Sequence, residues 1–144
     1  MKVKIKKLRN DIELPQYHTV DSAGVDLAAA IDEPIVLKPL DRKLIPTGIA
    51  LEIPKDYEIQ IRARSGMSLK HGITAANGVG TVDADFRGEI CAILINLSNK
   101  DFTIEPGMRV AQMVLSKYEK IEWDEKNEIN DTDRGKSGYG STGY

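Results

Sequence analysis

The sequence is poor in the side chains that build disulfides and metal centres. It has one cysteine, Cys91, and two histidines, His18 and His71, among 144 residues. A single thiol cannot form an intrachain disulfide, and no CxxC or HxE pattern is present. These absences exclude a disulfide framework and make a structural zinc site or a zinc-dependent deaminase site unexpected. A lone thiol favours a reducing compartment, so we expect a cytoplasmic protein.

Long apolar runs and an excess of one charge are also missing. No stretch approaches the ~18 apolar residues of a membrane-spanning helix. Residues 1–9 alternate basic and apolar side chains with no apolar run behind them, which is not the pattern of a signal peptide. The chain has 20 Lys and Arg and 22 Asp and Glu, for a formal net charge of −2. Because no broad positive field follows from this balance, we expect neither a nucleic-acid partner nor a membrane partner.

The length and the distribution of residues predict one core domain with an appended arm. A chain of 144 residues is long enough to bury its own core. Residues 119–133 are acidic and polar with few apolar side chains, and residues 134–144 are rich in glycine. This last segment has almost nothing to bury. We predict a β core over residues 1–133 and a mobile C-terminal arm over residues 134–144.

The apolar pattern before this tail is that of strands. Residues 57–63 and residues 3–6 alternate apolar and polar side chains, as half-buried strands do. Short apolar pieces between prolines fill residues 35–53. Residues 90–95 are apolar on both faces, which predicts a central strand, and residues 110–115 predict another. Short strands separated by proline and glycine indicate an all-β sandwich or barrel.

One short segment, residues 67–71, favours a helix. Ser65 is expected to cap its start, and Gly72 to end it in the left-handed conformation. Arg64 and Ser65 would then add a cation and a hydroxyl to the free N–H groups of a helix N-terminus, which attract anions. Residues 64–66 are therefore a candidate phosphate seat. The alternative is an exposed arginine beside a capping serine.

Residues 77–89 are the most informative stretch. Asn77-Gly78, with Gly80 close behind, predicts a tight hairpin whose backbone a ligand can approach. Free backbone N–H and C=O groups there can recognise the edge of a base. Asp83 follows and is suited to polarising a water molecule, although a turn aspartate is the alternative.

Further polar residues stand out elsewhere. Asp26 lies between two apolar residues, and either faces solvent or lines a pocket. Gln112 lies among apolar neighbours, where a buried amide needs partners, and is a ligand candidate. Arg109 is three residues away on the same strand, so we expect it on the opposite face and in a structural ion pair. Tyr139, between glycines, can close over a flat base.

Five segments in this order resemble the motifs of the trimeric dUTPase family: residues 23–27, 64–69, 77–89, 106–113 and 134–143. The ordered set is specific, although any single motif would be weak. The resemblance implies a jelly-roll-like β-sandwich or barrel with one short helix. It implies a homotrimer with active sites at the subunit interfaces, closed by the C-terminal arm. The implied reaction is hydrolysis of dUTP to dUMP and pyrophosphate by water attack on the α-phosphorus, with Mg²⁺.

The resemblance also implies roles for individual residues. Asp83 would be the base that activates the water, and Asp26 would act near Mg²⁺ through a bridging water, the metal being held mainly by the substrate phosphates. Phe86 would lie under the deoxyribose, and Tyr139 would cap the base. The other implied substrate contacts are Asn77, Gly80, Thr81 and Val82 at the uracil, Arg64, Ser65, Gly66 and Gln112 at the phosphates, and Arg134, Gly140, Ser141 and Thr142 in the arm.

Two positions depart from the family pattern, and two other functions are alternatives. Phe86 stands where tyrosine is common and keeps the ring without its hydroxyl, and Tyr139 stands where phenylalanine is usual. The related dCTP deaminases need a proton-shuttling glutamate in the third motif, where this chain offers Asp83. A non-catalytic nucleotide-binding module is the other alternative, against which an intact Asp83 argues.

Overall fold

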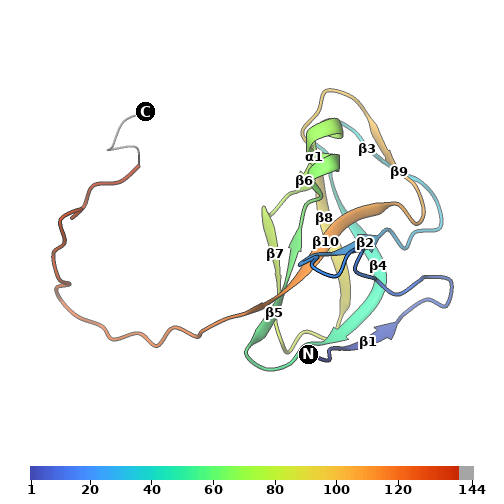
Figure 1. Cartoon of the computed structure of the whole chain (residues 1–144). Coiled ribbons are helices and arrows are strands. Elements are labelled where there is room, and N and C mark those ends of the chain that lie inside the picture. The colour runs from blue at the N-terminus through green and yellow to red at the C-terminus, as the bar shows by residue number, and fades with distance from the viewer. Residues whose placement is uncertain (140–144) are drawn as a thin grey trace.

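The computed structural model describes residues 1–139, which contain ten strands and one short helix (Figure 1). All but one of these elements are strands, so the prediction of an all-β protein with one short helix is confirmed. The elements are β1 Lys4–Lys7, β2 Val25–Ala28, β3 Ile35–Leu37, β4 Arg42–Glu52, β5 Tyr57–Arg62, α1 Ser65–His71, β6 Ile73–Ala75, β7 Val79–Val82, β8 Glu89–Asn96, β9 Phe102–Ile104 and β10 Arg109–Lys117.

The strands form two four-stranded antiparallel sheets and a small two-stranded one. The first sheet has the order β1-β4-β8-β6, the second β2-β10-β5-β7, and the third pairs β3 with β9. Apolar side chains from these sheets pack together in one core, as in a jelly-roll-like sandwich. The large apolar residues of this core that are less than 2 % exposed are Leu27, Leu37, Ile45, Ile49, Ile73, Ile90, Leu94, Ile104 and Val110.

The strand predictions hold with two corrections. All of β5 lies within the predicted residues 57–63, and residues 90–95 lie in β8 between β4 and β6, as expected for a central strand. The apolar pieces after Pro39 are one strand, β4, because its register shifts between Pro46 and Ala50 and so tolerates the proline. The half-buried pattern expected around residues 3–6 is wrong for β1, where even Ile5 is exposed. This strand lies at the sheet edge and pairs only with β4.

The helix begins two residues earlier than predicted. Arg64 is its N-cap, in an extended conformation and without a capping side-chain hydrogen bond, so the expectation that Ser65 caps the helix is wrong. Ser65 is already the first helical residue, and its hydroxyl makes no capping bond to the turn that follows. Gly72 ends the helix in the left-handed conformation, at φ 69°, as predicted.

The turn at Asn77-Gly78 joins the two large sheets. Gly78 has φ 70°, and its N–H donates to the carbonyl oxygen of Ala75 at 3.0 Å, so the predicted tight turn is present. The predicted hairpin is wrong, because β6 pairs with β8 whereas β7 pairs with β5. The turn sequence specifies the local backbone, but the neighbours of each strand are set by the packing of the whole sandwich.

After β10 the chain leaves the sheets and runs out as an extended segment (Figure 1). Every residue from 119 to 137 is exposed, including Ile121, Trp123 and Ile129. The exposed segment is therefore longer than its glycine-rich part. No helix in residues 1–139 is long and apolar enough to cross a membrane.

Candidate active site

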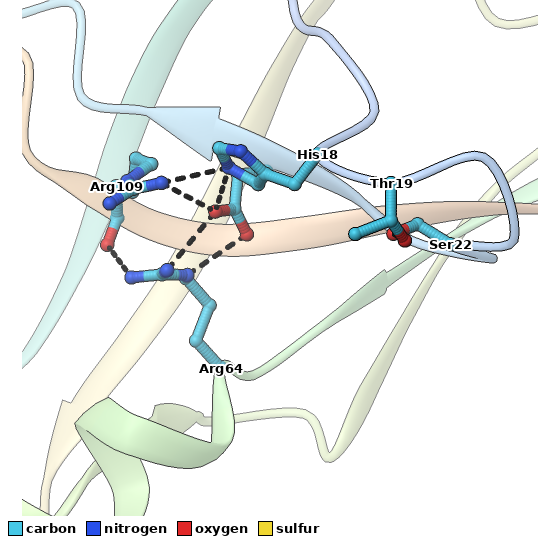
Figure 2. Close-up of polar contacts among 6 residues, drawn as sticks. His18, Thr19, Ser22, Arg64 and Arg109 are labelled. Carbon is cyan, nitrogen blue, oxygen red and sulfur yellow. Dashed lines mark hydrogen bonds and ion pairs between the residues drawn. The ribbon is translucent and has the colours of Figure 1, made fainter.

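Asp26 lines a pocket at the centre of the candidate site. It lies on β2, where Gln112 of β10 is its cross-strand partner, and its side chain is 18 % exposed. Arg64 follows β5 and donates two hydrogen bonds to this carboxylate, from Nε to Oδ1 at 2.9 Å and from Nη2 to Oδ2 at 3.0 Å (Figure 2). Two parallel bonds of this kind fix the geometry of both side chains.

Arg109 and His18 complete a cluster around the same carboxylate (Figure 2). Arg109 lies with Nη1 3.5 Å from Oδ2 of Asp26, so its predicted ion pair is confirmed. The same Nη1 lies 2.8 Å from Nε2 of His18, which is 3.2 Å from Asp26 Oδ2. Arg64 Nη1 also donates to the carbonyl oxygen of Arg109 at 3.0 Å. Two guanidinium groups against one carboxylate leave the cluster net positive, which favours a bound anion.

The strand between Arg109 and Gln112 is irregular. The pairing of β10 with β2 shifts register between Arg109 and Ala111. An extra residue in one strand changes which face the following side chains occupy. Arg109 contacts Asp26 and lines a neighbouring pocket with it, whereas Gln112 and Asp26 line the cavity, so Arg109 and Gln112 line different pockets.

Gln112 is held in a fixed position by its neighbours. Its Nε2 donates to the carbonyl oxygen of Ala63 at 2.9 Å. A Cβ on Gly24 would collide with the amide oxygen of Gln112, so only glycine leaves room for this amide. No local pattern predicted the Gly24 contact, because Gly24 and Gln112 are 88 positions apart and meet only once β2 and β10 pair.

A cavity of about 370 Å³ opens beside this cluster. It brings together Asp26 and the four residues that we expected at the phosphates, although they come from β2, the start of α1 and β10. Lys70 and His71, from the last turn of the helix, also line it. The full lining is Asp26, Arg64, Ser65, Gly66, Met67, Lys70, His71 and Gln112.

The residues expected at the uracil form a second group. Asn77 and Thr81 are exposed, on the turn and on β7. Gly80 is buried, and a Cβ there would lie 3.2 Å from both Asn77 Nδ2 and Ile61 Cβ, a tight contact. Val82 ends β7, and Asp83 follows it directly as an exposed residue.

Within one chain, Asp83 lies far from the cavity. β7 pairs with β5 so that Val82 stands opposite Ile59, five residues before Arg64. At about 3.3 Å per residue this separation is about 16 Å along the sheet. The catalytic candidate and the phosphate candidates are therefore two separate groups in the single chain.

Phe86 lies on a loop that is stabilised by hydrogen bonds among its own residues. The N–H of Phe86 donates to the carbonyl oxygen of Asp83 at 3.1 Å, which makes a turn. Arg87 Nη1 donates to the carbonyl oxygens of Ala84 and Phe86 at 2.7 and 2.8 Å. The ring packs over Gly88, where an added Cβ would lie 2.5 Å from Phe86 Cζ. The ring remains 45 % exposed and is free to meet a ligand.

The arm residues stand apart from both groups. Arg134 Nε donates to the carbonyl oxygen of Ser137 at 3.0 Å, which is a contact within the arm. Tyr139 is fully exposed and has φ 51°. Gly140, Ser141 and Thr142 lie outside the described residues.

The segment that precedes His18 is linked by Arg9 to the loop between β2 and β3. Arg9 donates to Asp11 and Asp32 at 2.7 and 2.6 Å, and the hydrogen bond from Arg9 lowers the pKa of Asp11 to about 2. No pattern in the sequence indicated His18, because its contacts with Asp26 and Arg109 depend on the pairing of β2 with β10. Among residues 1–139, no group of three or more His, Cys, Asp or Glu side chains is arranged to hold a metal ion.

Fold and cavity together define a class of protein, a jelly-roll-like β protein with a net positive pocket between two strands and a helix. A family model described as dUTPase matches residues 10–143. The chain belongs to the dUTPase family.

Individual relatives agree with this assignment. The deoxyuridine 5'-triphosphate nucleotidohydrolase of Rickettsia felis is 57 % identical over 142 residues, which cover 98 % of this chain and 96 % of the relative. The Rickettsia prowazekii protein of the same name is 56 % identical over 144 residues, 99 % of this chain and 97 % of the relative. A dUTPase mutant of Staphylococcus bacteriophage 80alpha, solved with dUpNHpp, matches with a TM-score of 0.89 and 25 % identity, over 99 % of both chains.

Proposed function

We propose that this chain is a dUTP diphosphatase that hydrolyses dUTP to dUMP and pyrophosphate, which limits uracil in DNA and supplies dUMP for dTMP synthesis. The observation that carries the proposal is the cavity in which Arg64, Ser65, Gly66 and Gln112 meet beside a net positive cluster. The Rickettsia relatives, which carry the name of this activity, support it. Its location in the cytoplasm stays a prediction.

The active form is a homotrimer with its sites between subunits. Asp83 must come within hydrogen-bonding reach of a water at the phosphate chain, yet the residue before it, Val82, already stands about 16 Å along the sheet from Arg64 of the same chain. A second copy can supply the missing carboxylate. The outer face of the first large sheet supports such contacts, since Leu44 and Ile93 are cross-strand neighbours and are 62 % and 41 % exposed. Burying such apolar pairs between subunits stabilises the assembly.

The chemistry needs a positioned water and a fixed phosphate chain. Asp83, as a carboxylate, accepts a hydrogen bond from the water and takes its proton as the water oxygen attacks the α-phosphorus. The bond from that phosphorus to the bridging oxygen of pyrophosphate breaks. Arg64 has five N–H donors, of which three are used within the chain, so two remain for phosphate oxygens. The Ser65 hydroxyl and the Gln112 amide add hydrogen bonds.

The third motif selects the nucleoside. Backbone groups of residues 78–82, with Asn77, hydrogen-bond the uracil edge, and cytosine would leave some of them unpaired, at a cost of orders of magnitude in rate. The same backbone excludes a methyl group at C5. Phe86 lies under the deoxyribose and leaves no space for a 2′-hydroxyl. From the arm, residues 134–144, Arg134 binds the outer phosphate, Tyr139 stacks on the base, and Gly140 and Ser141 close over the substrate.

The residues of the cavity fit a magnesium ion that arrives with the substrate. Both oxygens of Asp26 already accept hydrogen bonds from Arg64, and this carboxylate would act on a metal through a bridging water. The phosphate oxygens would be the direct ligands, which is a common arrangement for Mg²⁺. When bound, the ion supplies charge neutralisation of the leaving pyrophosphate.

The decisive experiment measures pyrophosphate release from each deoxynucleoside and ribonucleoside triphosphate, with Mg²⁺ and with a chelator. We expect release from dUTP alone, and only with the metal. Release from every triphosphate would contradict the proposed base recognition. Ammonia production from dCTP would instead establish the related deaminase activity.

A further inference from the structure

The cationic side chains that line the cavity differ in how many contacts they already make within the chain. Arg64 directs Nε and Nη2 to Asp26 and Nη1 to the carbonyl oxygen of Arg109, so its guanidinium faces this carboxylate (Figure 2). The charge of Arg64 is therefore partly balanced by Asp26 before any ligand binds. His71 lines the cavity as well, but its ring packs against Phe102 with centroids 5.0 Å apart. A polyphosphate, which carries several negative charges, needs a further cation here.

Lys70 is placed to be that cation. It lies four residues after Gly66, and residues at this spacing share one face of a helix, so both line the same cavity. Its side chain is exposed, whereas Asp26 and Arg64 are 18 % and 28 % exposed, which places Lys70 at the mouth of the cavity. None of the ion pairs among residues 1–139 involves its ammonium.

We infer that Lys70 binds the outer phosphates of the nucleotide and is a further substrate-binding residue. The inference rests on the proposed function. An ammonium at the mouth interacts with the end of the phosphate chain, while Arg64, Ser65 and Gln112 hold the part that lies deeper. Its contribution therefore grows with the number of phosphates on the ligand.

The test compares Lys70→Gln with Lys70→Arg and with the matched control Lys55→Gln, which removes an exposed lysine just before β5, at the strand end remote from Arg64. We expect Lys70→Gln to raise KM for dUTP about tenfold with little change in kcat, which is typical of one charged hydrogen bond. Arginine should restore most of the affinity, and the Lys55 variant should match the parent protein. Calorimetry should show weaker binding of dUpNHpp and dUDP, and unchanged binding of dUMP.

The outcomes separate this inference from the proposed function. A parent protein that does not hydrolyse dUTP overturns the proposed function and the inference with it. An active parent with the same KM in the Lys70→Gln variant overturns the inference alone. Equal weakening for dUMP and dUpNHpp would assign Lys70 a structural role and would also overturn it.

Discussion

The proposed role of the exposed Asp83 carboxylate as general base predicts the effect of removing its charge. In Asp83→Asn the amide keeps the shape of the side chain but cannot take a proton from water, so kcat should fall by about 10²–10⁴-fold. Binding of dUpNHpp should stay near that of the parent, because no substrate contact depends on the charge. Pyrophosphate release and calorimetry measure the two quantities. Normal turnover in this variant would remove Asp83 from its proposed role.

The reactivity of Cys91, the single thiol, tests how its surroundings on β8 shift its pKa. Burial raises the pKa of Cys91, and the negative charge of Glu89 raises it further. A raised pKa lowers the thiolate fraction at pH 8, and thiolate is the reactive form. We expect alkylation of Cys91 by iodoacetamide to be slower than that of glutathione under the same conditions, and to accelerate as the pH rises. Equal rates at pH 8 would contradict this account, and unfolded protein provides the control.

The residues that the sequence could predict are those whose local neighbours carry the information. Gln112 among apolar residues indicated a ligand site, and Asp26 between apolar residues indicated either a pocket or a solvent-facing carboxylate. Both line the cavity. His18 and Gly24 were missed, because their contacts depend on β2 and β10 coming together. Lys70, which also lines the cavity, was missed because the sequence does not distinguish it from other exposed lysines.

The C-terminal arm offers a prediction about one element. Every residue from 119 to 137 is exposed, so deleting residues 134–144 removes little buried surface. The truncated protein should keep its melting temperature within a few degrees, because almost no packing is lost. Turnover of dUTP should nearly vanish, since the groups that close over the substrate are gone. Calorimetric melting and a pyrophosphate assay measure both effects, and a truncated protein with normal turnover would contradict the closing arm.

Elements were predicted well from the sequence where one strand or one turn suffices. The alternation in residues 57–63 and the apolar run in residues 90–95 each gave a strand, and the glycine of Asn77-Gly78 gave the tight turn. The pairing around that turn was not predicted, because β6 and β7 join different sheets. The side-chain period of a strand specifies its buried face, whereas its neighbours depend on the packing of all ten strands in residues 1–139.

At the scale of the whole molecule, the distance between Asp83 and the cavity decides how the site must be assembled. A site within one chain would need a carboxylate near Arg64, but the pairing of β5 with β7 places Val82, the residue before Asp83, about 16 Å away along the sheet. In a ring of identical subunits, each interface places the same two surfaces together. The cavity of one subunit would then meet the third motif of another.

This assembly predicts that two inactive variants restore activity when mixed. Asp83→Asn keeps an intact cavity, and Arg64→Gln keeps an intact third motif, so each alone should be nearly inactive. If subunits combine at random after refolding together in equal amounts, about a quarter of the sites receive the intact cavity and the intact carboxylate from different chains. Pyrophosphate release should therefore recover to about a quarter of the parent rate. Mixing without unfolding serves as the control, and a refolded mixture no more active than its components would show that both groups come from one chain.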